Sequence, residues 1–391
     1  MEHGVAIGDT ERLICSVLRQ AQADWREGDD ADAMARFLAA GRYHGVLPLL
    51  DAEFRRRKAI ESWPREILDA CHEAALSGAM LELARRVENR QVIDALVAAG
   101  ATPLVLKGAA LAYRHYPNPA LRPRGDTDFL IPPQCREAAA SALAALGYAK
   151  DAGVEGEFVS YQATWTRETG NGIGHCLDVH WRINNSQMLA RVLTYDELAA
   201  RAAPLPPLGP NARAVGDVDA LLFACLHRAG HANAPYYTGG VAHFGDRAIW
   251  LYDIHLLVTR MSGAELDDFA ARAMAKRIRT ICADALRRST EWFGTPIPQR
   301  VADILNAPGP VEPSARYLSG GRARQMVGDF LALDRWSDRA GWVKELAFPS
   351  TDYMRTKYPD AADAWLPILY ARRGLTGVSR LVFSRDANHG L

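Results

Sequence analysis

The sequence predicts an α+β fold that is mostly helical, with a small mixed sheet flanked by N-terminal and C-terminal helical regions. Apolar residues recur at helical spacing through the first hundred residues and stop at Gly100, a residue suited to closing a helix. Short apolar runs bounded by glycine and proline follow, and long helical patterns then resume. We therefore expect three domains: an N-terminal helical domain, a mixed α/β core and a C-terminal helical domain, at residues 1–100, 101–186 and 187–391.

The expected core alternates strands with helices. Strands are predicted at residues 103–106, 127–131, 158–166 and 176–183, and helices at residues 109–116 and 136–146. No strand is expected after residue 187, where a proline-rich stretch at residues 204–210 is typical of a stiff linker.

Composition restricts the class of partner and the compartment. Lys plus Arg and Asp plus Glu number 46 each, so the formal net charge is zero, which makes nucleic acid an unlikely partner. The six cysteines form no CxxC pair and indicate reduced thiols. The N-terminal residues lack a signal-peptide layout, and no run of about 18 apolar residues indicates a membrane span. We expect a cytoplasmic protein that does not bind membranes.

Two aspartates open the second predicted strand. Asp126 and Asp128 are two residues apart, so their side chains leave the same face, about 7 Å apart along the backbone. Their mutual repulsion is relieved by a divalent cation, and carboxylate oxygens suit magnesium. The neighbouring residues Phe129 and Ile131 are expected on the opposite face, in the core.

A candidate phosphate-binding turn precedes this pair. Lys107-Gly108 follows the first predicted strand and opens a helix. Glycine permits close approach of the backbone, and the N–H groups at a helix N-terminus favour phosphate. Phosphates held beside metal-binding carboxylates suit phosphoryl or nucleotidyl transfer.

A third carboxylate is predicted on another strand. Asp178 lies between the apolar residues Leu177 and Val179, so it is expected to point away from the core with His180. It is a candidate to face the same cleft as Asp126 and Asp128.

These residues together resemble the poorly characterised bacterial nucleotidyltransferases of the DNA polymerase beta-like superfamily. The resemblance rests on the Lys107-Gly108 turn, Tyr116-Pro117, Arg122, Gly125-Asp126-x-Asp128 and Asp178 before His180-Trp181. It implies a small mixed sheet flanked by helices, which makes residues 101–186 a nucleotidyltransferase core.

The resemblance also implies a metal-dependent enzyme. Such an enzyme moves a nucleoside monophosphate from a nucleoside triphosphate, ATP among them, to a hydroxyl of a small molecule or protein and releases pyrophosphate. Asp126 and Asp128 would bridge two magnesium ions (Mg2+, with Mn2+ as the alternative), while Asp178 would bind the catalytic metal and accept the acceptor's proton. The nucleotide-binding residues would be Lys107, Gly108, Ala109, Arg122 and Gly125.

One position departs from the family pattern. The wider superfamily has Gly-Ser in the phosphate turn, whereas this chain has Gly108-Ala109 and lacks the hydroxyl. Lys107 is a candidate to compensate. The alternative function is a nucleotide-binding or interaction module on the same fold with weak or no catalysis.

The remaining polar candidates have more than one interpretation. His180, His227, His231 and Asp253 form a candidate acceptor site. His227 and His231 share a helix face, so with His175 or His180 they are also candidates for a zinc site, or for a buried network in which Asp253 accepts from an imidazole. Arg122 is expected either to neutralise phosphate or to pair with a carboxylate and brace its loop.

Overall fold

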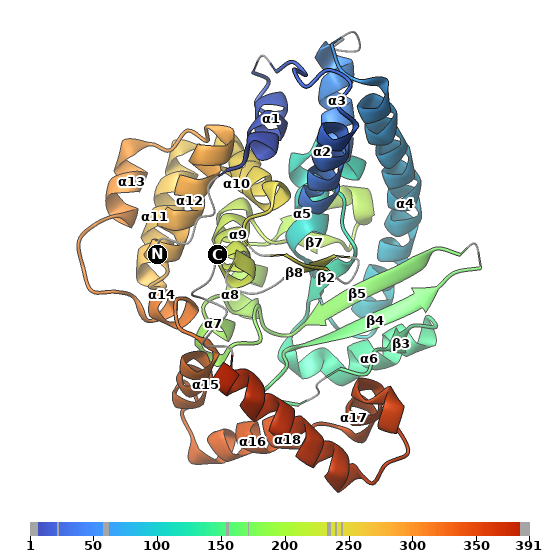
Figure 1. Ribbon diagram of the computed structural model, residues 1–391. Coiled ribbons are helices and arrows are strands. Elements are labelled where there is room, and N and C mark those ends of the chain that lie inside the picture. The colour runs from blue at the N-terminus through green and yellow to red at the C-terminus, as the bar shows by residue number, and fades with distance from the viewer. Residues whose placement is uncertain are drawn as a thin grey trace.

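A mixed sheet runs through the protein and carries helices on both faces (Figure 1). The computed structural model describes residues 7–21, 23–57, 62–153, 156–170, 172–232, 236–238, 241–243 and 245–383. Within these residues, seven strands form one sheet in the order β3-β4-β5-β2-β1-β7-β6. Their bounds are β1 (Leu104–Val105), β2 (Thr127–Leu130), β3 (Ala149–Lys150), β4 (Gln162–Glu168), β5 (Gly174–His180), β6 (Ala203–Pro204) and β7 (Arg213–Ala214). The predicted fold class, α+β and mostly helical, is confirmed.

The pairing of β2 with β5 sets the register at the centre of the sheet. The two strands are parallel, and Asp128 is the Cα partner of Asp178. On its other edge β5 pairs antiparallel with β4, which places Thr164 opposite Asp178. Partners in register point to the same face, so these three side chains lie in one row across the sheet.

The sequence predicts the central strands but misses the outer ones. The predicted strands correspond to β1, β2, β4 and β5. The expectation that no strand follows residue 187 is wrong, because β7 pairs parallel with β1 and β6 pairs antiparallel with β7. A second hairpin, β8 (Tyr236–Thr238) with β9 (Val241–His243), lies outside the main sheet. The domain boundaries at residues 100 and 186 remain a prediction, although the sheet includes β6 and β7.

Four helices precede the sheet, and capping explains the start of one and the end of another. Their bounds are α1 (Asp9–Leu18), α2 (Ala31–His44), α3 (Leu47–Arg57) and α4 (Arg65–Ala98). Asp30 caps α2 by accepting from the N–H groups of Asp32 and Ala33. Gly100, with φ 82°, closes α4 by donating to Val97, which confirms its predicted role.

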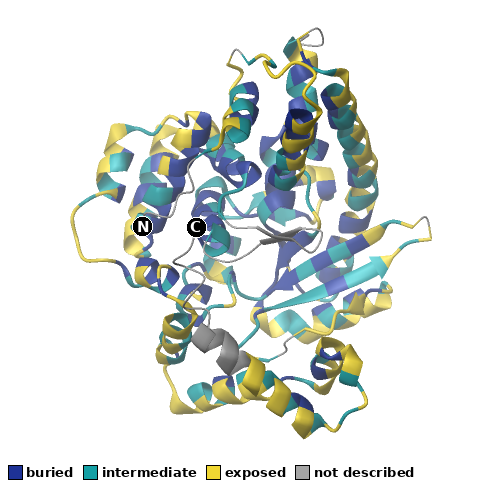
Figure 2. Ribbon diagram, viewed as in Figure 1, coloured by how far each residue is buried: buried dark blue, intermediate teal, exposed yellow. Residues whose placement is uncertain are grey.

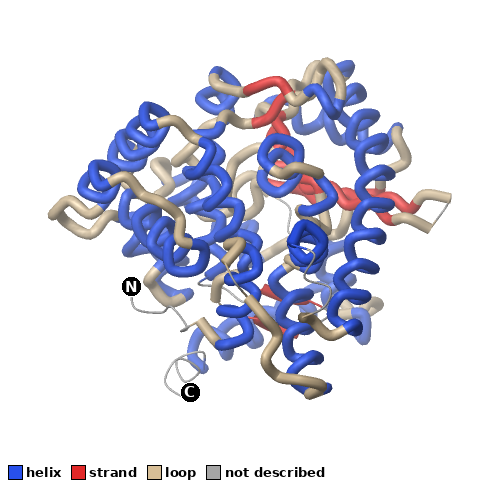
Figure 3. The backbone as a smooth tube through the Cα atoms, turned by 90° about the horizontal axis from the view of Figure 1, so that it is seen from above, coloured by secondary structure: helices blue, strands red, loops and turns tan. Residues whose placement is uncertain are grey.

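The other helices surround the sheet and extend beyond it (Figure 3). Two of them, α5 (Lys107–His115) and α6 (Arg136–Ala145), belong to the core segment. The later α-helices are α7 (Gln187–Ala190), α8 (Tyr195–Ala200), α9 (Asp217–Ala232), α10 (Ala248–Arg260), α11 (Gly263–Ala275), α12 (Arg279–Phe293), α13 (Gln299–Leu305), α14 (Pro313–Leu318), α15 (Arg322–Leu331), α16 (Trp336–Ala347), α17 (Thr351–Lys357) and α18 (Leu366–Phe383). Short 3-10 helices are η2 (Pro119–Leu121), η3 (Pro133–Cys135), η4 (Pro206–Leu208) and η5 (Pro359–Ala361).

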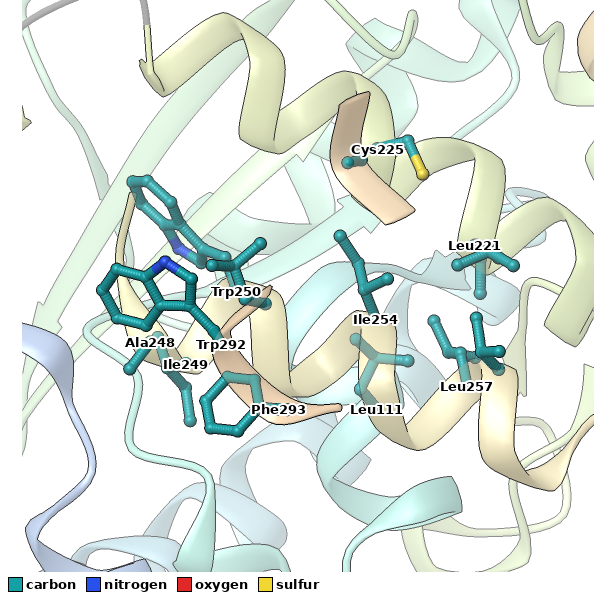
Figure 4. Close-up of a cluster of buried hydrophobic side chains, with 14 of the residues drawn as sticks. Leu111, Leu221, Cys225, Ala248, Ile249, Trp250, Ile254, Leu257, Trp292 and Phe293 are labelled. Carbon is teal, nitrogen blue, oxygen red and sulfur yellow. The ribbon is translucent and has the colours of Figure 1, made fainter. Parts of the chain in front are cut away.

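Two hydrophobic clusters hold the sheet between the helices. The larger joins α1–α4 to α5 and α9–α12, so N-terminal and C-terminal helices share one core. Figure 4 shows part of it, where Leu111 of α5 lies beside Ile254 and Leu257 of α10. The smaller cluster covers the opposite face and contains Phe129 and Ile131, as predicted. The row that contains Asp128 lies on the other face of the sheet, toward the helices of the larger cluster.

Among the described helices, none combines the length and the apolar character that a membrane span needs.

Candidate active site

The turn between β1 and α5 holds Lys107 in a left-handed backbone conformation. The φ angle of Lys107 is 48°, a conformation that costs a non-glycine residue about 1–3 kcal/mol and persists where the surroundings fix it. α5 begins here, and its N-cap residue Leu106 makes no side-chain capping bond in the described structure. The first N–H groups of α5 are therefore free of a side-chain cap, the arrangement that favours an anion.

Three carboxylates line a cavity beside this turn. Asp126 immediately precedes β2, Asp128 lies within β2, and Asp178 is its register partner in β5. All three line one cavity of about 710 Å³, together with Lys107 and Gly108. Asp178 lies on the same face as Asp128, and Asp126 lines the same cavity without belonging to the close group that these two acids form with His180. The role of the three acids as one metal site remains a prediction.

Asp128 is the most buried of the three acids and has two nitrogen partners. Lys107 Nζ lies 2.6 Å from its Oδ1, and His180 Nε2 lies 2.9 Å from the same oxygen. Burial alone would raise the pKa of Asp128, but Lys107 and His180 hold that pKa well below its usual range. Asp128 is therefore a carboxylate, and its contact with Lys107 joins the phosphate turn to β2.

Asp126 experiences the opposite electrostatic environment. Burial and the nearby charges of Asp128 and Asp178 raise the pKa of Asp126 to about 6. Asp178 is half-buried and accepts a 2.6 Å hydrogen bond from Thr164 Oγ1 on β4. The site thus concentrates negative charge that one lysine only partly offsets, which is a cost to stability without a cation.

The donor set fits a hard divalent cation. Asp128, Asp178 and His180 each offer one ligand atom, and these atoms lie within 4.8 Å of one another. No other group of three or more such residues occurs in the described chain, so the zinc set built on His227 and His231 does not form. Carboxylate oxygens suit magnesium and manganese. The bond from His180 to Asp128 is the kind of contact that orients a ligating carboxylate.

Arg122 braces its loop, which is the second of its two expected roles. Its guanidinium is buried and bonds Asp253 on α10 through Nε and Nη2, with contacts of 2.7–3.1 Å. Tyr116 Oη donates to the same carboxylate at 2.7 Å. Asp253 does not line the 710 Å³ cavity, but it lines a smaller neighbouring pocket with Lys107, Gly108 and His227. Its place in an acceptor site therefore remains a prediction.

His227 and His231 do line the cavity, on the side formed by α9. Their ring centroids are 4.5 Å apart, and both rings pack against Trp250. Burial lowers the pKa of His227, and the neighbouring charges of His231 and Lys107 add to this; burial also lowers the pKa of His231. Both are neutral imidazoles at pH 7, able to donate or accept but not to neutralise phosphate.

The rest of the cavity wall comes from segments far apart in the sequence. Gly125 and Ala109 lie on its rim, although the side chain of Ala109 packs in the smaller hydrophobic cluster. Further residues on the wall are Arg42, Arg247, Gln162, Asn185, Tyr317 and Gln325. Sequence analysis misses these residues, and it also misses Thr164. The alternation along β4 is the one sequence pattern that indicates the direction of the Thr164 side chain. It does not give the register that puts Thr164 beside Asp178.

Gly108 is the point where the phosphate turn meets the Arg122 brace. A Cβ added at Gly108 would lie 3.1 Å from Arg122 Cζ and Nη1, and the two-point bond to Asp253 prevents the guanidinium from moving away. We expect Gly108→Ala to lower the free energy of unfolding by about 1–3 kcal/mol. Urea unfolding followed by circular dichroism measures this.

The control for that substitution is Gly78→Ala on α4. There the added Cβ meets one backbone oxygen at an ordinary 3.5 Å. This variant is expected to be neutral or more stable by up to about 1 kcal/mol, since alanine favours helix. Equal losses in the two variants would show that the Gly108 contact is not special.

Comparison with known proteins adds the family. A family model described as an uncharacterised nucleotidyltransferase matches residues 30–294, which is more than half of the 391 residues. Comparison with curated proteins gives no match. The matched region runs from the N-cap of α2 to the C-cap of α12 and includes all seven strands of the sheet and all three acids. The general chemistry is therefore that of an enzyme of nucleotidyl transfer, and the chain belongs to the uncharacterised nucleotidyltransferase family.

Proposed function

We propose that this protein is a metal-dependent nucleotidyltransferase of the polymerase beta-like type, which transfers a nucleoside monophosphate from a nucleoside triphosphate to a hydroxyl acceptor. The observation that carries the proposal is the register of β2 with β5. It places Asp128 and Asp178 side by side, with Asp126 in the same cavity and the Lys107-Gly108 turn at its edge. The acceptor oxygen bonds to the α-phosphorus, the bond to the bridging oxygen breaks, and pyrophosphate leaves.

The side chains divide the work of binding and proton transfer. Lys107 and the N-terminus of α5 offer a positive charge and N–H groups to the phosphates. We assign to Asp178 the role of accepting the acceptor's proton, because this side chain is half-buried and has no cationic partner in the described chain. Asp126, Asp128 and Asp178 would hold magnesium or manganese, which supplies charge neutralisation at the entering and leaving oxygens.

We place the acceptor beside His227 and His231. The same cavity is also lined by uncharged polar residues, among them Gln162 and Asn185, and by Arg42 and Arg247. A volume of about 710 Å³ suits a small molecule or a single protein side chain in addition to part of the nucleotide. Zero net charge disfavours a long nucleic acid acceptor.

The proposal is tested by incubating the protein with each α-labelled nucleoside triphosphate and magnesium or manganese, with and without a fractionated cell extract. Transfer of label with stoichiometric pyrophosphate release supports it. Absence of both with all common triphosphates and extracts contradicts it.

A second candidate function is nucleotide binding without turnover, and the surroundings of Ala109 favour it. No hydroxyl stands at this position, and the side chain points into the core. This function predicts a nucleotide-dependent rise in melting temperature with magnesium, lost in Asp128→Asn, but no label transfer to any acceptor.

Lys107 is expected to contribute directly to triphosphate binding. Removal of one charge-assisted contact of about 1.5–3 kcal/mol should raise the KM for triphosphate about 10–100-fold in Lys107→Met. Initial-rate kinetics with the preferred triphosphate measure this. The control is Lys150→Met on β3, a lysine that does not line the cavity. Equal KM values for the two variants would remove Lys107 from the site.

A further inference from the structure

One helix of the protein carries an apolar stripe on its solvent side. α4 is 34 residues long, about 50 Å at the usual rise per residue, and it lies at the outer edge of the molecule (Figure 1). Leu76, Met80, Leu83 and Val87 are each more than half exposed, from 54% for Leu76 to 72% for Met80. Figure 2 shows this side of α4 as exposed and half-buried residues.

The spacing of the stripe is that of a helix–helix contact. The four residues are separated by four, three and four positions, which places them in one row along the helix, as in the seam of a coiled coil. The opposite side of α4 is occupied by the protein itself, where Ile67, Cys71 and Ile93 are buried. The stripe is therefore additional to the contacts that hold α4 in the fold, and exposed contiguous apolar surface of this kind marks an interaction site.

The stripe matches a second copy of itself that runs in the opposite direction. The two inner residues, Met80 and Leu83, are equidistant from the point between Leu81 and Glu82, and so are the two outer residues. In an antiparallel pair of α4 helices, Met80 of one copy therefore faces Leu83 of the other, and the outer residues face each other in the same way. A two-fold contact of this kind is the commonest in homo-oligomers.

The charges beyond the stripe match the same arrangement. Glu73 precedes the stripe and Arg90 follows it, and the two are also equidistant from its centre. Both residues are exposed, and neither forms an ion pair within the described part of the chain. An antiparallel second copy would place Glu73 opposite Arg90 twice, once on each side of the axis, whereas a parallel copy would place like charges together.

We propose that α4 is the interface of a homodimer, in which a second copy of this chain packs antiparallel along Leu76, Met80, Leu83 and Val87. The occupant is a second copy because the apolar row and the flanking charges complement themselves under one two-fold axis. No residue of α4 lines the 710 Å³ cavity, so the contact does not use the cavity wall. Four apolar side chains per helix make a small interface, so the dissociation constant is expected at about 1–100 μM.

Sedimentation of the full chain from about 1 to about 200 μM tests the proposal. The wild-type protein should pass from monomer to dimer across this range, while Met80→Glu stays a monomer. Glu73→Arg and Arg90→Glu should each weaken the dimer about 10-fold or more, because each places like charges together. The control Glu27→Arg, an exposed charge reversal away from α4, should dimerise as the wild type does.

Mixing the two charge variants gives the sharpest result. When one copy carries Glu73→Arg and the other carries Arg90→Glu, both facing pairs become opposite in charge, so an equimolar mixture should dimerise again. A wild-type monomer at the highest concentration overturns the proposal. Dimers that are insensitive to Met80→Glu, or charge variants that fail to recover on mixing, also overturn it, and retained melting temperatures show that each variant is folded.

Discussion

Asp178→Asn is expected to lower kcat for pyrophosphate release by at least about 10³-fold, because the variant loses both a metal-binding carboxylate and the proton acceptor. The fold should survive the change, since the amide oxygen can still accept the hydrogen bond from Thr164. Removal of one of three mutually repelling charges should leave the free energy of unfolding unchanged or higher. Initial rates and urea unfolding, measured on the same preparation, check both parts.

A similar pair that also uses a threonine of β4 supplies the control. Asp151 accepts a 2.8 Å hydrogen bond from Thr166, as Asp178 does from Thr164, but it does not line the cavity. Asp151→Asn should keep its rate within about twofold of the wild type, in line with an exposed substitution. An Asp178→Asn variant with nearly full activity would remove Asp178 from the chemistry.

Asp253→Ala should produce the largest loss of stability. It leaves the buried guanidinium of Arg122 without a counter-charge and removes the acceptor of Tyr116. Breaking a buried ion pair on one side costs about 3–5 kcal/mol, so the urea midpoint should fall sharply. Because Arg122 touches Gly108, triphosphate binding should weaken as well.

The comparison with an exposed pair shows whether burial is the cause. Asp267 pairs with Arg300 on the surface, and both side chains are about half exposed. Asp267→Ala should cost less than about 1 kcal/mol. If Asp253→Ala cost no more than this, the Arg122 brace would not be a stabilising element of the loop. The double variant Arg122→Met/Asp253→Leu should recover much of the loss, since apolar residues can replace a buried pair.

The central strands and their acids are predictable from sequence for a local reason. In β5 the apolar residues Leu177 and Val179 are two positions apart, so both side chains point into the core. Asp178 lies between them and must therefore point to the other face. The same holds for β2, where Phe129 and Ile131 bury one face and leave Asp128 on the other. The family resemblance then links the two strands, and the parallel register places Asp128 beside Asp178.

The parts that sequence analysis misses depend on contacts between distant residues. β6 and β7 have two residues each, too few for an alternation, and they lie in a proline-rich stretch that is typical of a linker. Arg122 and Asp253 are 131 positions apart, so composition cannot decide between phosphate and a carboxylate as the partner of that arginine. His180 has the expected direction, but its bond to Asp128 requires the register of two strands.

The cavity wall is formed by two parts of the chain, one inside the family match and one beyond it. The acids and the phosphate turn lie within residues 30–294, whereas Tyr317 of α14 and Gln325 of α15 come from the chain beyond it. A change in the position of those two helices would alter this part of the cavity wall, whereas the three acids lie on or beside β2 and β5. Under the proposed function, the choice of acceptor would then depend partly on a segment that lies outside the family match, while the acids lie within it.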